Sequence, residues 1–267
     1  MAHSNSFQLH FSIDDVLPSL LEASDSCRPS DHWFFGFLDE IHRLIGIEVN
    51  LYLFEAVACG VNRRTLADVG EAVSAWIRKR PWLLLGPHAL DDATPPYAQT
   101  LPQQLATMER IYREIDRIAG PDQYSRWVRL HHFSETYELA PLFREHGVQA
   151  LLTTDKAAVC YRLPEEARLT LAGRGSVEYQ GLRFIRSDIR IEAAAAQFLS
   201  GLSWKDALRL APALRPPVVF THEYALSNPE IREATRTVLE FLSATGRGTG
   251  TPQGSLGIGS GMEEKLR

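Results

Sequence analysis

The fold is decided by the stretch FQLHFSIDDV at residues 7–16. Every second residue from Phe7 to Ile13 is apolar and the residues between them are polar, which is the period of a β-strand. Two adjacent carboxylates, Asp14 and Asp15, close the run. Because side chains alternate across a strand, both can serve one site only if the backbone turns there. This edge of a strand is where α/β barrels place their chemistry.

Outward from this stretch, apolar runs alternate with amphipathic helical patterns. We expect strands at residues 47–54, 82–86, 127–133, 148–154 and 216–221. We expect helices at residues 30–44, 65–80, 100–118, 134–143, 192–199, 204–210 and 227–242. The order of strands and helices predicts an α/β fold with a parallel sheet, open or closed into a barrel. Strand-like pieces broken by Gly and Pro at 158–190 predict a small antiparallel insertion. We expect residues 1–245 to form one domain and the glycine-rich residues 246–267 a flexible tail.

Composition narrows the classes of function. The 267 residues are 45% hydrophobic and 23% charged, with a net charge of −5, and no basic cluster suggests a nucleic-acid partner. Three widely separated cysteines argue against a disulfide framework or a cysteine zinc site. We find no secretory signal pattern and no apolar run long enough to cross a membrane, so we expect a cytoplasmic protein.

Titratable residues gather at the expected ends of the strands. Asp14 and Asp15 follow the first strand, and the other strand ends contribute His88, Asp91, Asp92, Arg129, His131, His132, Asp155, His222 and Glu223. Each has an ordinary structural interpretation when taken alone; we expect Glu223 to be solvated. Together they point to metal-assisted hydrolysis, in which a carboxylate and two further ligands hold a cation with an open position for water.

On these residues the chain resembles the NodB-type polysaccharide deacetylases, carbohydrate esterases built on a distorted (β/α) barrel. Ser12-Ile13-Asp14-Asp15-Val16 is similar to the family's first motif, which implies that Asp14 is the base and Asp15 a metal ligand. His88 and Asp92 take the place of a pair of histidines four residues apart, implying two more ligands. Later motifs imply that Arg129 orients the base, that Asp155 matches a family Asp, and that His222 is the acid.

The sequence departs from the family pattern at several positions. Val16 replaces a glycine, and the second metal histidine is missing. Asp91 could replace Asp92, and His131 or His132 could supply the third ligand. We expect a divalent metal, zinc first, with cobalt, manganese or iron as alternatives, because these metals accept mixed histidine and carboxylate ligands.

The resemblance implies a mechanism and leaves rivals open. Asp14, oriented by Arg129, deprotonates the attacking water, and His222 protonates the leaving group. The implied substrate is an N- or O-acylated carbohydrate or a small amide. One rival is a degenerate barrel that binds a carbohydrate-like ligand without turnover. Another is an amidohydrolase, although the first strand lacks the His-x-His pair of that class. We find no GxGxxG motif for a Rossmann-type enzyme, and the oligomeric state stays open.

Overall fold

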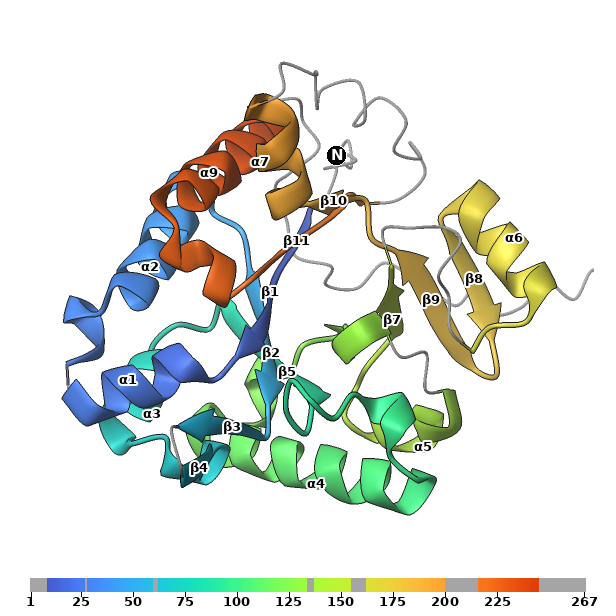
Figure 1. Cartoon of the computed structure of the whole chain (residues 1–267), viewed down its shortest axis with the longest axis horizontal. Helices are drawn as coiled ribbons and strands as arrows, with labels where there is room; N and C mark the ends of the chain where they lie inside the picture. Colours follow the sequence, from blue (N-terminus) through green and yellow to red (C-terminus); the bar gives the residue numbers. More distant parts are fainter. Residues whose placement is uncertain are drawn as a thin grey trace, which may run out of the picture.

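A computed structural model describes residues 9–26, 28–59, 62–133, 137–154, 162–199 and 216–244 (Figure 1). The expected helix at 204–210 and the glycine-rich tail lie outside these residues. The strands are β1 (His10–Val16), β2 (Val49–Phe54), β3 (Ala56–Cys59), β4 (Asn62–Thr65), β5 (Leu83–Ala89), β6 (Trp127–Val128), β7 (Ala150–Thr153), β8 (Ser176–Tyr179), β9 (Leu182–Arg186), β10 (Ile189–Arg190) and β11 (Val218–His222). The helices are α1 (Pro18–Ser26), α2 (Trp33–Ile45), α3 (Glu71–Arg78), α4 (Leu101–Ile118), α5 (Ala140–Glu145), α6 (Glu165–Arg174), α7 (Ile191–Leu199) and α9 (Pro229–Ala244).

The parallel strands form two sheets that meet at two junctions. One sheet has the order β10-β11-β1-β2-β5, and the other the order β6-β7-β9-β8. All neighbouring pairs are parallel except β8 with β9. At one junction the Ser125 N–H donates to the Leu85 carbonyl (2.8 Å), just before β6. At the other, Ser187 N–H donates to Thr153 O and Asp188 N–H to Val218 O, so the chain passes from one sheet to the other between β9 and β10.

The parallel strands therefore follow one another around an irregular, barrel-like ring, as the predicted fold class required. β1 lies between β2 and β11 and is buried along nearly its whole length. Helices cover the outside, with α1, α2 and α9 on one side of β1 and α4 below β5 (Figure 1). A capping box of Thr100 and Gln103 opens α4, whose buried face includes Met108 and Ile111. Parallel strands bring their C-terminal ends to one rim.

Four local expectations differ from the structure. β6 ends at Val128, and residues His131–Phe133 form a 3-10 turn in place of a strand. The expected helix at 65–80 begins only at Glu71, as α3, because Asn62–Thr65 pair with Ala56–Cys59 in a hairpin and Leu66–Asp68 form a 3-10 turn. The region at 158–190 contains α6 as well as the expected antiparallel pair, and β9 of that pair is also a barrel strand next to β7. Glu223 is 4% exposed, so its expected solvation was wrong.

Candidate metal centre and active site

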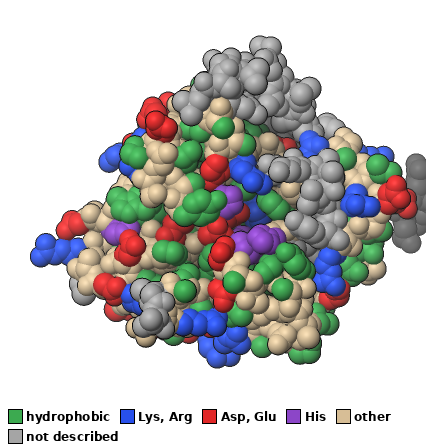
Figure 2. Space-filling view, in the orientation of Figure 1, with side chains coloured by type: hydrophobic (Ala, Val, Ile, Leu, Met, Phe, Trp, Pro, Cys, Tyr) green, Lys and Arg blue, Asp and Glu red, His purple; other side chains and the backbone are tan. Residues whose placement is uncertain are grey.

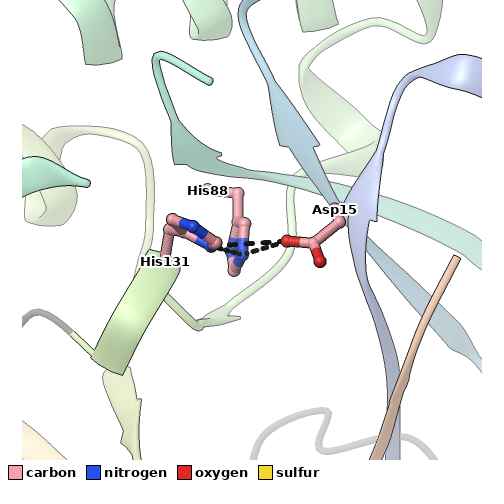
Figure 3. A group of neighbouring side chains, drawn as sticks. All are labelled: Asp15, His88 and His131. Atoms are coloured by element: carbon pink, nitrogen blue, oxygen red, sulfur yellow. Dashed lines mark hydrogen bonds and ion pairs between the residues drawn. The ribbon is translucent and has the colours of Figure 1, made fainter. Parts of the chain in front are cut away.

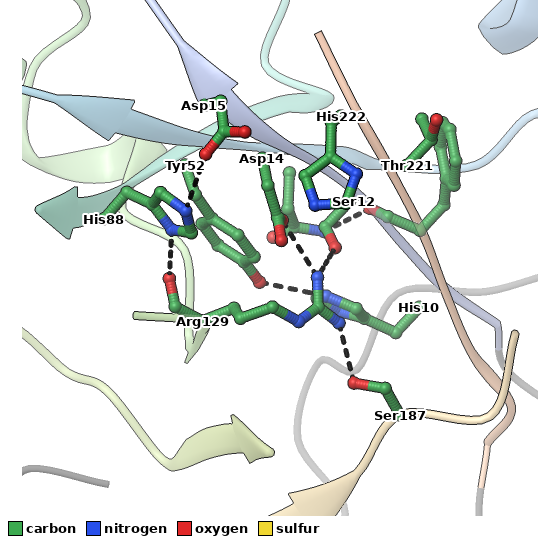
Figure 4. Close-up of polar contacts among 12 residues, drawn as sticks. His10, Ser12, Asp14, Asp15, Tyr52, His88, Arg129, Ser187, Thr221 and His222 are labelled. Carbon is green, nitrogen blue, oxygen red and sulfur yellow. Dashed lines mark hydrogen bonds and ion pairs between the residues drawn. The ribbon is translucent and has the colours of Figure 1, made fainter. Parts of the chain in front are cut away.

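The backbone turns at the adjacent carboxylates of β1. Asp15 adopts a φ of +64°, a left-handed conformation that is uncommon outside glycine. The pairing of β1 with β2 shifts register between Ile13 and Val16, as at a β-bulge. Such irregularities re-aim side chains at the end of a strand. Here Asp14 and Asp15 both reach the region between His88 and His222 (Figure 4).

Three ligand-type atoms meet at this rim of the barrel. Asp15 Oδ1 lies 3.1 Å from His88 Nε2 and 3.4 Å from His131 Nδ1 (Figure 3). The two histidine nitrogens are 3.3 Å apart. The three atoms form a nearly equilateral triangle. A tetrahedral zinc ion with bonds of about 2.0–2.1 Å would hold its ligand atoms roughly 3.3 Å apart, so the triangle has the size of one face of such a site.

Backbone carbonyls set which nitrogen of each histidine faces the triangle. His88 Nδ1 lies 2.7 Å from the Arg129 carbonyl, and His131 Nε2 lies 3.1 Å from the Asp92 carbonyl. A carbonyl only accepts, so each of these nitrogens carries the proton and donates it. The opposite nitrogen of each ring then presents a lone pair toward Asp15. Hydrogen bonds of this kind fix the tautomer of metal-binding histidines.

The charge state of Asp15 also suits a cation. Burial by itself raises the pKa of this carboxyl, but hydrogen bonding and charge from protonated His131 and His88, together with the charge of His222, outweigh burial and hold its pKa well below the ordinary value. In the metal-binding state, where both rings turn lone pairs toward Asp15, a cation would supply this stabilisation instead. Asp15 Oδ1 is buried and receives no hydrogen bond of normal geometry within the described part of the chain. A buried anionic oxygen without a hydrogen bond is costly unless a cation binds it. The donor set of one carboxylate and two imidazoles therefore fits a divalent metal.

Asp14 lies beside this group in a different environment. Arg129 Nη1 donates to Asp14 Oδ1 (2.9 Å) and to Ser12 Oγ (2.7 Å), and Nη2 donates to Ser187 Oγ (3.0 Å) (Figure 4). The Arg129 side chain is 1% exposed and that of Asp14 is 3% exposed. The guanidinium is thus fixed by three acceptors and holds one oxygen of Asp14. Arg129 therefore holds the Asp14 carboxylate in one orientation.

His222 stands on the other side of Asp14, opposite it in the register of β1 and β11. Its Nδ1 lies 3.0 Å from Glu192 Oε1, which also accepts from the backbone N–H of His222 (2.9 Å) and the Thr221 hydroxyl (2.9 Å). Burial lowers the pKa of His222, but Glu192 and the nearby Asp14 and Asp15 outweigh it and raise the pKa. A histidine with a raised pKa is suited to give up a proton as a general acid.

The other predicted site residues lie around this group. The Asp92 side chain is 89% exposed and its Oδ1 is 3.7 Å from His131 Nε2, so the side chain grouped with Asp15 and His88 is that of His131 and not that of Asp92. Asp91 pairs with Arg63 (3.3 Å). His132 stacks on His131, and its Nδ1 is 3.1 Å from the Tyr97 hydroxyl. Asp155 lies outside the described residues.

Sequence reasoning missed Glu192, Ser187 and the burial of Glu223. Glu192 is the second residue of α7 and contacts His222 from 30 positions away, and no motif marks it. Ser187 lies in the break between β9 and β10. Viewed from outside, histidine side chains lie among acidic and basic ones near the middle of this face (Figure 2).

Comparisons with known proteins concern the fold. No protein-family model matches the chain, and no curated protein sequence matches it. A 4-alpha-glucanotransferase from Thermococcus litoralis is similar, with a TM-score of 0.52 and 13% identity over 89% of this chain. The match spans only 36% of that enzyme. At this identity the likeness shows a shared fold alone.

Structures of family 4 carbohydrate esterases are also similar, at low identity. An esterase from Streptomyces lividans in complex with acetate has a TM-score of 0.45 and 10% identity, covering 90% of this chain and 89% of its own. A pseudoenzyme of that family from Bacillus anthracis has a TM-score of 0.42 and 12% identity, covering 92% and 64%. Separately, no helix in the described part of the chain has both the length and the apolar character needed to cross a bilayer.

Proposed function

We propose that the chain is a metal-dependent hydrolase that removes an acyl group from an N- or O-acylated carbohydrate or a small amide. The observation that carries this proposal is the triangle of Asp15, His88 and His131, with both tautomers fixed. Zinc is the metal that best suits two imidazoles and one carboxylate with an open position. In this proposal Asp14 is the base and Asp15 is a metal ligand.

A bound divalent cation would polarise the substrate carbonyl and lower the pKa of water at the site. Asp14, held by Arg129, accepts the proton of the attacking water. Arg129 donates to Oδ1, so the second oxygen is the one that takes this proton. His222, whose pKa Glu192 helps to raise, donates a proton to the departing amine or alcohol. Amide cleavage depends on such an acid because an unprotonated amine is a poor leaving group.

The surroundings of the centre support a sugar-like substrate. Tyr224 is 67% exposed and stacks on His222, and Tyr97 is 47% exposed and stacks on His132. Exposed aromatic rings offer flat apolar surface and a polar hydroxyl to a ligand. The order of motifs that resembles NodB-type deacetylases points to the same substrate class.

Acetate release tests the proposal. The wild-type protein, loaded with zinc, is incubated with N-acetylated and O-acetylated mono- and oligosaccharides and with small acetamides. We expect release by the wild type and none by Asp14→Asn, which should retain its metal because Asp14 lies outside the triangle. Binding of a sugar without any release would favour the binding-only alternative. Full turnover by Asp14→Asn would remove Asp14 from the role of base.

A further inference from the structure

Glu223 joins the two strand ends that carry the candidate site. Its carboxylate accepts the backbone N–H of Leu17 at Oε2 (2.9 Å) and of Ser19 at Oε1 (2.6 Å). These amides lie at the start of α1, immediately after the turn at Asp15. The backbone N–H of Glu223 donates to the Asp14 carbonyl (2.9 Å). Three hydrogen bonds therefore connect the residue after His222 to the segment that holds both aspartates.

A capping role alone does not explain this residue. Helix N-termini are usually capped by a Ser, Thr, Asp or Asn next to the helix in sequence, exposed to water. Glu223 comes from more than 200 positions away and is 4% exposed. Burial raises its pKa to about 7; hydrogen bonds from the Ser19 side chain and from the backbone amides of Ser19 and Leu17 oppose this shift, and Glu22 is a nearby like charge. Burying a carboxylate among amides is costly, which a cap exposed to water avoids.

The geometry of the site gives a better reason for a buried glutamate at position 223. Asp15 has a positive φ, which is strained for a residue with a Cβ. The bonds from Leu17 and Ser19 to Glu223 hold the chain just beyond this turn, and the bond to Asp14 O holds it just before. His222 and Glu223 are adjacent on the chain, so these three hydrogen bonds, which we call the Glu223 clamp, also set the spacing between His222 and the two aspartates.

We propose that Glu223 is a positioning residue that fixes the Asp14–Asp15 turn against His222, and so sets the geometry of the metal ligands. This inference rests on the proposed metal site. Replacing Glu223 by Gln keeps the size of the side chain but turns an NH₂ group toward one of the two backbone N–H donors. The turn then loses one bond and gains a repulsion, and Asp15 moves relative to His88 and His131.

Cobalt binding tests the clamp without requiring a known substrate. Cobalt(II) affinity and visible absorption are measured for the wild type, Glu223→Gln and Val238→Ala, well below the unfolding temperature of each. Val238 is a fully buried residue of α9, so its variant controls for lost stability. We expect Glu223→Gln to bind cobalt about tenfold more weakly, in the range seen when supports of metal ligands are removed, with an altered spectrum, and Val238→Ala to match the wild type.

Three other outcomes of the cobalt experiment would overturn the inference about Glu223. If Glu223→Gln binds cobalt with wild-type affinity and spectrum, the clamp does not position the ligands and this inference is overturned, while the metal site stands. If Val238→Ala loses affinity equally, the loss follows from stability and the inference is also overturned. If the wild type binds no cobalt, the proposed function fails and this inference fails with it.

Discussion

Replacing Arg129 by Met should destabilise the protein strongly, because it leaves Asp14 buried without its cation. The two side chains are 1% and 3% exposed, and Arg129 Nη1 is 2.9 Å from Asp14 Oδ1. Breaking a buried pair by removing one partner costs about 3–5 kcal/mol. This is a large part of the about 5–15 kcal/mol that keeps a typical domain folded. Ser12 and Ser187 also lose the donor that they share.

A double-mutant cycle separates the charge from the packing. Adding Asp14→Asn to Arg129→Met removes the uncompensated charge, so we expect the free energy of unfolding to recover by about 2 kcal/mol or more. Urea unfolding of the metal-free proteins at pH 7 measures each corner of the cycle. Arg236→Met is a matched control, since Arg236 pairs with Glu40 at 2.7 Å but both side chains are partly exposed, and its cost should stay below about 1 kcal/mol.

Two results would show that the Arg129–Asp14 pair does not stabilise the protein in this way. A cost for Arg129→Met no greater than that of Arg236→Met would mean that the buried pair contributes little. Additive costs in the cycle, with no recovery on adding Asp14→Asn, would mean that Arg129 acts through packing and not through the charge of Asp14.

Three further predictions concern metal binding and pH. His131→Ala should weaken zinc binding at least 100-fold, whereas Asp92→Ala should leave zinc affinity within about twofold, because the Asp92 side chain is 89% exposed; competition titration with a chelator measures both. Glu192→Gln should lower the pKa of His222, which Glu192 helps to raise, so the alkaline limb of the pH–rate profile should move to lower pH. Glu223 has a pKa raised to about 7 by burial, so its contribution to stability is fully present below about pH 4.5 and is lost as pH rises through about 7. The loss amounts to about 3 kcal/mol, and unfolding of Glu223→Gln between pH 4.5 and 7.5 should lack it.

Each of these has a clear opposing result. Equal loss of zinc in Asp92→Ala and His131→Ala would return Asp92 to the ligand set. An unmoved alkaline limb in Glu192→Gln would separate that limb from His222. A pH dependence of stability that is the same with and without Glu223 would show that this carboxyl ionises in the folded protein as it does in the unfolded chain.

The strand ends could be predicted from sequence because alternation and chain order are local signals. The pattern before Asp14 places it on β1, and parallel order alone brings Asp14, His88, Arg129 and His222 to one rim. The structure has them there. The turn at Asp15 was a condition of that reasoning, and the φ of +64° meets it.

Which of His131 and His132 lies next to Asp15 could not be predicted from the sequence. The expected strand at 127–133 implied that His131 and His132 point to opposite faces. The chain leaves β6 at Val128, and His132 and Phe133 have positive φ values that no sequence pattern announces. That turn brings His131 Nδ1 to Asp15. The contacts of Glu192 and Glu223 could not be predicted for another reason: their partners lie 30 and more than 200 positions away in the sequence.

Metal stoichiometry is the decisive test of the site formed by Asp15, His88 and His131. Elemental analysis and zinc titration are carried out on the wild type and on Asp15→Ala, His88→Ala and His131→Ala, each checked for folding by circular dichroism. We expect one tightly bound zinc per wild-type chain and at least 100-fold weaker binding in each variant. A folded wild-type protein that binds no divalent metal, or variants that keep it with unchanged affinity, would contradict it.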